Sequence, residues 1–162
     1  MMVQISTQST RRQHPVVHIP GDPYTSLYRS GVMDRIGLIV AGVAATDAKR
    51  WLDILALGRS ETLKALDLSV ATFNKKVKAN ARLSPAESER VVGFARLVGQ
   101  IEAMFEEAGG PPEFDVHAWL ARWLTDPLPA LGNARPIDFM NTMEGQALIS
   151  QKLAQIASGA YA

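Results

Sequence analysis

The sequence predicts an all-α protein in which an N-terminal helix-turn-helix region precedes a second helical domain. Three observations support this prediction. Apolar residues recur at spacings of three and four along most of the chain, which is the period of an amphipathic helix. Several of these segments begin with a serine, threonine or aspartate that can cap a helix, and some end at a glycine. No segment alternates apolar and polar residues as a half-buried strand does.

The charges divide the chain into two parts. Although the net charge of the 162 residues is only +1, residues 1–82 hold 12 Lys/Arg against 6 Asp/Glu, and residues 83–162 hold 5 against 10. This difference suggests two surfaces with different partners, the basic one suited to a polyanion. The alternative is one fold with two solvated faces. We expect a flexible arm over residues 1–24, a helix-turn-helix domain over 25–82 and a second domain over 83–162.

Motifs for catalysis and cofactor binding are missing. The sequence has no phosphate loop, dinucleotide fingerprint, HExxH motif or nucleophile elbow. It has no cysteine, which excludes a disulfide, a thiolate metal site and a thiolate nucleophile. His14 and His18 are four residues apart, but Pro15 between them disfavours the helix that would direct both at one metal. We therefore expect no enzymatic activity, no cofactor and no metal.

Nothing in the sequence directs the chain to a membrane. The N-terminus lacks the apolar segment of a signal peptide. No apolar run reaches about 18 residues, the length that a membrane span needs. The expected location is the cytoplasm.

The first half of the chain begins with a polar arm rich in proline and turn residues. From Thr25 to Val43, apolar residues recur at helical spacing, although three glycines weaken the pattern. Thr46 is expected to cap the next helix, which carries Trp51 on its buried side and ends at Gly58.

Two short helices and a tight turn form the predicted helix-turn-helix. Ser60 is expected to cap the first of these helices. A turn over residues 67–69 then leads into a helix over residues 70–78, with Ser69 as its cap. The apolar positions of this second helix recur at helical spacing and predict one buried stripe, made of Val70, Phe73 and Val77.

The opposite face of the 70–78 helix is polar and basic. A helix with an apolar back and a front of Thr, Asn and Lys can lie in the major groove of DNA, where lysines contact phosphates and Asn and Thr reach base edges. The alternative is a solvated charged face on an ordinary helical bundle. The candidate DNA-binding residues are Ser69, Thr72, Asn74, Lys75, Lys76 and Lys78.

The clearest local signal is the sequence Ser-Pro-Ala-Glu at residues 84–87. It is a capping box with proline at the first helical position, and it predicts a helix from Pro85 to about Glu107. The apolar face of this helix is wide enough to pack on more than one neighbour, so it joins the two halves or pairs two chains. Glu102 and Glu106 lie at helical spacing and are expected to be solvated rather than catalytic.

A Gly-Gly-Pro-Pro break at residues 109–112 follows this long helix. Asp115 is then expected to cap a helix that carries Trp119 and Trp123, which we assign to the core rather than to a contact surface. His117 beside them is expected to be structural.

Residues 126–159 are predicted to form a loop followed by one more long helix. Residues 126–135 contain two prolines and read as a loop, and Pro136 begins another short turn of helix. Thr142 caps the last helix, which runs from residue 143 to about residue 157 and ends at Gly159.

Several motifs occur in a fixed order in the second half of the chain. They read RLSPAESER at residues 82–90, WLTDP at 123–127, ALG at 130–132, RPIDFM at 135–140, TMEG at 142–145 and IASGAYA at 156–162. Together they resemble the Xre/MbcA/ParS class of antitoxins. The similarity covers about Met33 to the C-terminus and is strongest from Arg82 onward.

The resemblance implies an Xre-like helix-turn-helix region and a C-terminal toxin-binding domain. Members of the class neutralise a RES-type toxin, which consumes NAD or transfers ADP-ribose from it, and their C-terminal end covers or enters the toxin's NAD cleft. Members commonly self-associate, and many repress their own operon. The implied partners are a cognate RES-type toxin, a second copy in a homodimer that forms a higher toxin–antitoxin complex, and operator DNA.

The resemblance also places the toxin-binding surface in the C-terminal half. Tyr161, in the tail after the last helix, can insert an aromatic ring where nicotinamide or adenine would stack. Two segments depart from the family pattern: residues 109–116 are longer than the usual connection, and residues 73–76 replace an arginine-rich stretch. The candidate toxin-binding residues are Trp123, Leu131, Gly132, Arg135, Met140, Thr142, Gln146, Ile149, Lys152, Leu153, Ile156, Gly159 and Tyr161.

The function expected from sequence is that of an antitoxin that obstructs a RES-type toxin and binds operator DNA to repress its own synthesis. The alternative is a stand-alone helix-turn-helix transcription regulator whose C-terminal half only dimerises. The two differ in whether the acidic half has a toxin as its partner.

Overall fold

The computed structural model describes residues 23–159, which form eight α-helices and two 3-10 turns and no strand within that range. The predicted all-α class is confirmed for this part of the chain. The elements are α1 (Pro23–Arg29), α2 (Val32–Ala41), α3 (Ala45–Leu52), α4 (Arg59–Ala65), α5 (Val70–Lys78), α6 (Pro85–Glu107), α7 (Val116–Thr125), η1 (Pro129–Leu131), η2 (Pro136–Phe139) and α8 (Met143–Ala157).

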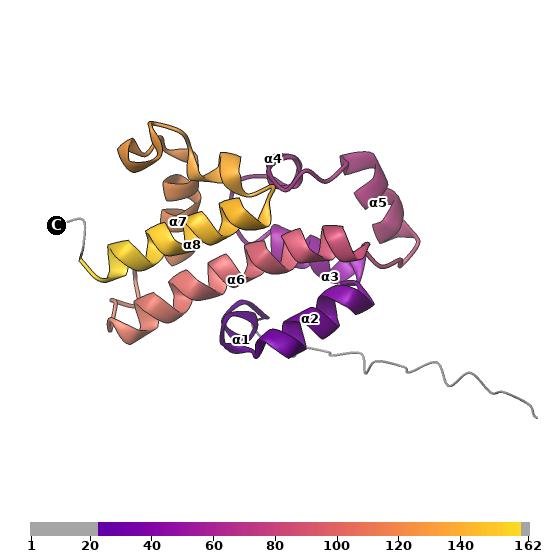
Figure 1. Ribbon diagram of the computed structural model, residues 1–162, viewed down its shortest axis with the longest axis horizontal. Coiled ribbons are helices and arrows are strands. Elements are labelled where there is room, and N and C mark those ends of the chain that lie inside the picture. The colour runs from indigo at the N-terminus through magenta and orange to yellow at the C-terminus, as the bar shows by residue number, and fades with distance from the viewer. Residues whose placement is uncertain (1–22, 160–162) are drawn as a thin grey trace, which may run out of the picture.

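The long helix α6 is the axis of the fold. In Figure 1, α8 lies along one side of it and α1 and α2 along the other. Helices α3 and α7 also pack on α6, so most elements of the chain contact it directly. One continuous apolar core results, with buried side chains from every α-helix except α2, whose half-buried Leu38 and Ile39 pack against it. The wide apolar face predicted for this helix is therefore confirmed.

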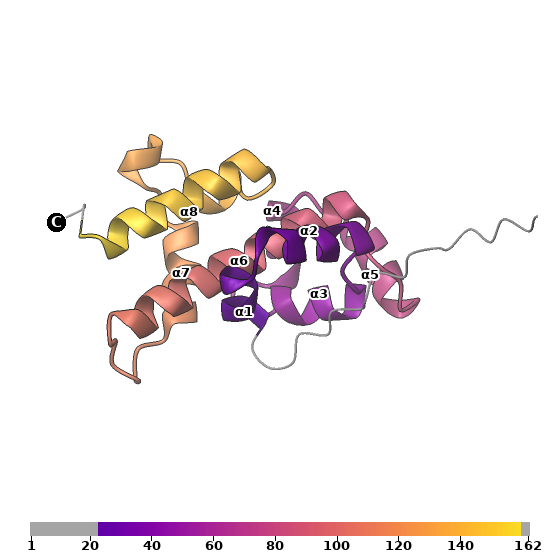
Figure 2. The ribbon, with the colours of Figure 1, turned by 60° about the horizontal axis from the view of Figure 1, so that its bottom comes forward.

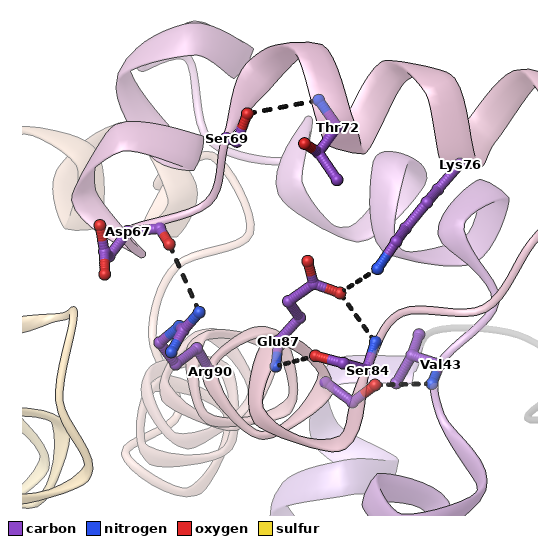
Figure 3. Close-up of polar contacts among 9 residues, drawn as sticks. Val43, Asp67, Ser69, Thr72, Lys76, Ser84, Glu87 and Arg90 are labelled. Atoms are coloured by element: carbon purple, nitrogen blue, oxygen red, sulfur yellow. Dashed lines mark hydrogen bonds and ion pairs between the residues drawn. The ribbon is translucent and has the colours of Figure 1, made fainter.

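Helix α6 starts at the predicted capping box (Figure 3). The Ser84 hydroxyl accepts a hydrogen bond from the Glu87 amide at 3.1 Å, and the Glu87 carboxylate accepts one from the Ser84 amide at 2.7 Å. The same carboxylate oxygen of Glu87 lies 2.5 Å from the Lys76 ammonium of α5. The next residue also contributes, because the Ser88 hydroxyl accepts a hydrogen bond from the Val43 amide at 2.9 Å. These contacts fix the first turn of α6 to both preceding segments.

The close approach of α1 to α6 requires a glycine at position 99. A Cβ atom at Gly99 would lie 1.9 Å from the Tyr24 carbonyl oxygen, so any larger residue would push the helices apart. Tyr24 is itself buried, and its hydroxyl donates to the Trp51 carbonyl at the end of α3.

The region from Thr25 to Val43, whose glycines suggested close packing or a break, contains two helices, α1 and α2, with the break at residues 30 and 31. The Ser30 hydroxyl donates to the Leu27 carbonyl at 2.8 Å, and Gly31 is extended, with ψ 153°, as the residue before α2. Serine and glycine favour such breaks for different reasons. The serine hydroxyl forms a hydrogen bond to a nearby backbone group, and glycine loses more backbone entropy than other residues when it enters a helix. Helix α1 also begins inside the predicted arm, and the rest of the arm lies outside the described residues.

Two predicted helix caps are wrong. Helix α3 begins at Ala45 rather than after Thr46, because the Ala45 amide is satisfied by the Ala81 carbonyl at 2.9 Å instead of by a side chain. It also ends at Leu52, well before Gly58. Helix α4 begins directly after Gly58, whose φ of +80° turns the chain, and Ser60 lies inside its first turn.

We predict that Glu87 stabilises the fold in a pH-dependent way. Burial raises the pKa of this carboxyl, but the hydrogen bonds from Lys76 and Ser84 outweigh burial, so the pKa lies below its usual range. A lowered folded-state pKa gives a stabilisation that is fully present above the unfolded-state pKa of about 4.3 and is lost as pH falls through the folded-state pKa. Glu87→Gln should therefore lower the free energy of unfolding at pH 7 by about 1 kcal/mol.

Denaturant titrations of wild type and Glu87→Gln at pH 7 and pH 3 would test this, with Glu89→Gln as the control on the same helix. The difference between wild type and E87Q should shrink at the lower pH. A difference of equal size at both values would contradict the proposed role of the charge.

Candidate functional surfaces

Helices α4 and α5 form the predicted helix-turn-helix. The turn between them places Asp67 in the left-handed region at φ +53°, and the Leu68 amide donates to the Leu63 carbonyl at 2.8 Å. Ser69 caps α5 as predicted, because its hydroxyl accepts a hydrogen bond from the Thr72 amide at 3.3 Å. Helix α5 lies at the opposite end of the molecule from the end of α8 in both views (Figures 1 and 2).

One face of α5 is open and basic. Asn74, Lys75 and Lys78 are exposed and surround a shallow hollow whose remaining walls are Ala71 and Ala79. No acidic residue lines this hollow. The small alanines leave room for a phosphate backbone or a base edge to reach the two lysines and the amide.

Two predictions for α5 need correction. Lys76 does not share the open face with Lys75 and Lys78, because its half-buried ammonium is held by Glu87 of α6 (Figure 3). Val70 is 40% exposed, so the buried stripe consists of Phe73 and the half-buried Val77. The open face is therefore narrower than the sequence indicated.

The C-terminal half contains a tight loop between α7 and α8. The Leu128 amide donates to the Ala134 carbonyl at 3.1 Å, and Gly132 turns the chain with φ +64°. Arg135 and Asp138 form a two-point ion pair, with nitrogen–oxygen distances of 3.2 and 2.8 Å. This hydrogen-bonded pairing lowers the pKa of Asp138 and raises that of Arg135. The loop is thus held in one shape by its own contacts.

Four of the candidate toxin-binding residues are buried, and three of them belong to the apolar core. Those on α8 are buried because a helix that packs on α6 must bury one side of itself, and their role as contact residues stays a prediction. Gln146 illustrates the point, since its amide nitrogen donates to the Arg90 carbonyl at 3.1 Å and to the Met140 carbonyl at 2.9 Å. The four are Met140, Gln146, Ile149 and Leu153.

The other candidates lie at or near the surface. Thr142 is exposed and also caps α8, accepting a hydrogen bond from the Gly145 amide at 3.0 Å. Trp123 stacks on Trp119 with ring centroids 6.1 Å apart, and both are half-buried against the core. The exposed candidates are Gly132, Arg135, Thr142 and Gly159; the half-buried ones are Trp123, Leu131, Lys152 and Ile156. Tyr161 lies outside the described residues.

An apolar groove that was not predicted from sequence lies where the C-terminal ends of α6 and α8 meet α7. Its volume is about 430 Å³, and its walls include Phe105, Phe114, Trp119 and Ile156. Phe105 and Phe114 stack with ring centroids 4.7 Å apart. Phe114 could not be found by helical spacing, because it lies in the connection between two helices. The groove is at the end of α8 where the chain continues to its last residues.

The two glutamates of α6 singled out in the sequence differ, because the side chain of Glu102 is 13% exposed and that of Glu106 is 70% exposed. Glu102 lies 2.6 Å from the His117 ring and accepts a hydrogen bond from the Thr25 hydroxyl at 3.0 Å, so it is not the solvated residue that we expected. The structural role expected for His117 agrees with this contact. Within residues 23–159, no group of three His, Cys, Asp or Glu residues is arranged to hold a metal ion, and none of the helices is long and apolar enough to cross a membrane.

Comparison with known proteins gives two matches to protein families. Residues 34–96 match the antitoxin Xre-like helix-turn-helix domain, and residues 102–159 match the antitoxin Xre/MbcA/ParS C-terminal toxin-binding domain. The two matched regions meet inside α6. The predicted division at residues 82 and 83 stays a prediction.

Two relatives are similar over large parts of the chain. A Sphingobium sp. (strain YBL2) protein named "Prs ADP-ribosylating antitoxin" is 52% identical over 143 residues, which cover 88% of this chain and 90% of that protein. A Pseudomonas putida (strain KT2440) protein named "Antitoxin Xre" is 26% identical over 92 residues, which cover 57% of this chain and 52% of that protein.

The burial of one side of α8 predicts that alanine substitutions at Ile149 and Lys152 change the stability of the fold by different amounts. Ile149→Ala removes a fully buried side chain and should lower the free energy of unfolding by about 2–5 kcal/mol. Lys152→Ala, on the same helix but at the surface, should change it by less than about 0.5 kcal/mol. Urea unfolding followed by circular dichroism would measure both. A negligible effect of Ile149→Ala would mean that α8 is not packed as described.

Proposed function

Because the chain belongs to the Xre/MbcA/ParS family of antitoxins, we propose that it neutralises a RES-type toxin by covering that toxin's NAD cleft with its own C-terminal end. The chain is an antitoxin of a toxin–antitoxin system, with a helix-turn-helix domain and a toxin-binding domain. The observation that carries the proposal is the match of residues 102–159 to the toxin-binding domain, because this region contains the groove and the end of α8.

The NAD-dependent character of the toxin is supported by the 52% identical relative, whose name joins an antitoxin to ADP-ribosylation of Prs. Transfer of ADP-ribose requires a donor such as NAD, so the toxin must hold this dinucleotide in a cleft. An antitoxin can block such a cleft without a catalytic group of its own. We accordingly propose that this chain is not an enzyme.

The end of α8 is suited to obstruct a cleft. Gly159 ends α8 with φ +71°, and Tyr161 lies two residues beyond it in the sequence. An aromatic ring on a short tail can fill the site of a nucleotide base. The acidic character of residues 83–162 would attract a basic surface around the cleft and speed encounter. Ile156, which lines the apolar groove, would extend the contact from the tail onto the folded body.

We predict that the tail is required for inhibition. Deleting residues 158–162 or replacing Tyr161 with alanine should weaken inhibition of the cognate toxin at least about tenfold, since an aromatic anchor at an interface contributes about 2 kcal/mol or more. Tyr161→Phe keeps the ring and should inhibit nearly as well as wild type. The measurement is toxin-catalysed NAD turnover against antitoxin concentration. Unchanged inhibition by the deletion variant would refute the aromatic plug.

We further propose that α5 binds operator DNA and that two copies of the chain pair to do so. The support is the match of residues 34–96 to the Xre-like helix-turn-helix domain, together with the open basic face of α5. Helix-turn-helix proteins commonly bind as dimers to two half-sites one turn of DNA apart. The alternative of a stand-alone regulator is disfavoured by the match to a toxin-binding domain.

The two lysines of the open face should account for much of the DNA affinity. Replacing Lys75 and Lys78 together with alanine should weaken binding to the upstream region of the chain's own gene and reduce the slope of log affinity against log salt by about 2. Lys64→Ala, an exposed lysine on α4, is the matched control and should change little. Fluorescence anisotropy at several salt concentrations would measure this. Absence of wild-type binding at low salt would reject the DNA-binding role.

A further inference from the structure

A second groove runs between α6 and α8, with the end of α1 at its rim. Its volume is about 460 Å³. Leu97 and Gln100 of α6 are buried in its floor, whereas Tyr28 of α1 and Met143 and Ala147 of α8 are exposed. Figure 1 shows α8 lying along α6 over this stretch. A hollow of this size with a buried floor has the dimensions of a small-molecule site.

Arg96 is the one charged residue among the described residues that line this groove. It is half-buried, and it takes part in none of the ion pairs found within residues 23–159. Burial lowers the pKa of Arg96, and the positive charge of Arg35 on α2 lowers it further, while Tyr28 acts in the opposite direction. An arginine in such a place is normally paired with an anion. The described part of the chain supplies none.

Unpaired polar atoms gather at the same groove. Three buried side-chain nitrogen or oxygen atoms have no hydrogen-bond partner within the described range, and two of them belong to groove residues. These two are the Arg96 Nε and the Gln146 Oε1. A buried polar atom without a partner costs free energy, and proteins tolerate this cost mainly where a site serves a function. The groove is therefore a candidate binding site rather than a defect of packing.

We propose that this groove binds a small molecule that carries a phosphate or carboxylate group, which the Arg96 guanidinium holds. A guanidinium presents N–H donors in a planar fork that matches two oxygens of such a group. Arg35 would add attraction, because its own hydrogen bonds go to the uncharged Ser30 carbonyl and Ser30 hydroxyl and leave its charge uncompensated.

The rest of the groove favours an apolar or aromatic body on the ligand. Tyr28 offers a ring and Met143 a thioether, and both are suited to contact a ring of the ligand. Ala147 and Ala154 line the α8 side and leave space for it. The two polar groups below are already used, because the Ser150 hydroxyl donates to the Gln100 carbonyl oxygen at 2.6 Å and the Gln100 amide nitrogen donates to the Ser150 carbonyl at 2.9 Å.

A long polyanion fits this site less well than a small molecule does. DNA or an acidic peptide needs several cations spread over a surface. The exposed residues that line the α8 side are uncharged, and Glu144, next to Met143, is exposed and would repel a chain of negative charges. The inference concerns a ligand of the antitoxin itself and does not depend on inhibition of a toxin.

Phenyl phosphate is a direct probe, because it joins a phosphate to an aromatic ring. Isothermal titration calorimetry of the full chain, at ionic strength held constant with NaCl, should show saturable binding to one site per chain. Inorganic phosphate should bind at least about tenfold more weakly, because it lacks the ring that Tyr28 and Met143 would contact. Phenylacetate tests the carboxylate in the same way. A wild-type chain that binds neither phenyl phosphate nor phenylacetate at millimolar concentration overturns the proposal.

Arg96→Gln should weaken the binding of phenyl phosphate at least about tenfold, because it removes a charge-assisted hydrogen bond. The matched control is Arg90→Gln, since Arg90 is a half-buried arginine of the same helix that does not line the groove. R90Q should bind like wild type. Phenyl phosphate should also raise the melting temperature of wild type and R90Q but not that of R96Q. Equal losses of affinity in R96Q and R90Q would overturn the assignment of the groove.

Ala147→Leu keeps the test decisive if R96Q does not fold. It leaves Arg96 in place and fills the groove from an exposed position on α8, so it should weaken binding of phenyl phosphate at least about tenfold. Circular dichroism identifies the variants that are folded. A folded R96Q or A147L that binds phenyl phosphate as tightly as wild type overturns the proposal. Binding of an oligoglutamate peptide without any binding of phenyl phosphate would assign the groove to an acidic protein partner and overturn it as well.

Discussion

The hydrogen bonds at the first turn of α6 fix the arrangement on which the rest of the structure depends. The Glu87 carboxylate accepts hydrogen bonds from the Ser84 amide and from the Lys76 ammonium. One carboxylate therefore caps the start of α6 and also holds α5 against it. Ser88, the next residue of the same turn, accepts a hydrogen bond from the Val43 amide just before α3. These contacts hold the first turn of α6 to two segments and so fix the orientation of α6 relative to the helix-turn-helix. The later helices α7 and α8 then pack on α6.

A single helix therefore serves both functional regions. The helix-turn-helix match ends at residue 96 and the toxin-binding match begins at residue 102, both within α6. The core runs without interruption from α1 to α8. Because α5 and the end of α8 lie at opposite ends of the molecule (Figures 1 and 2), a DNA partner and a toxin partner would not compete for the same surface. The shared core holds the two sites at a fixed separation.

Burial separates residues that make the fold from residues that are free to bind. In the C-terminal half, Met140, Ile149 and Leu153 belong to the core, while Arg135 and Gly132 lie in a surface loop that its own ion pair keeps in shape. A motif shared by a family combines both kinds of residue, because a partner can bind only to a surface that is correctly folded. The outer face of α2 is the opposite case, since within residues 23–159 it exposes several large apolar side chains and has no fully buried residue.

The sequence by itself determined the features that depend only on residues close together in the chain, such as helix caps. Ser69, Ser84, Asp115 and Thr142 cap their helices as predicted, because a cap needs only an amide two or three residues ahead. Tertiary structure decided the rest. Ala45 needs no side-chain cap because a distant carbonyl serves it, and Lys76 leaves the basic face because Glu87 of another helix holds it. Helical period identifies an apolar face, but only the packed fold shows which such face has a neighbour and which, as on α2, has none among residues 23–159.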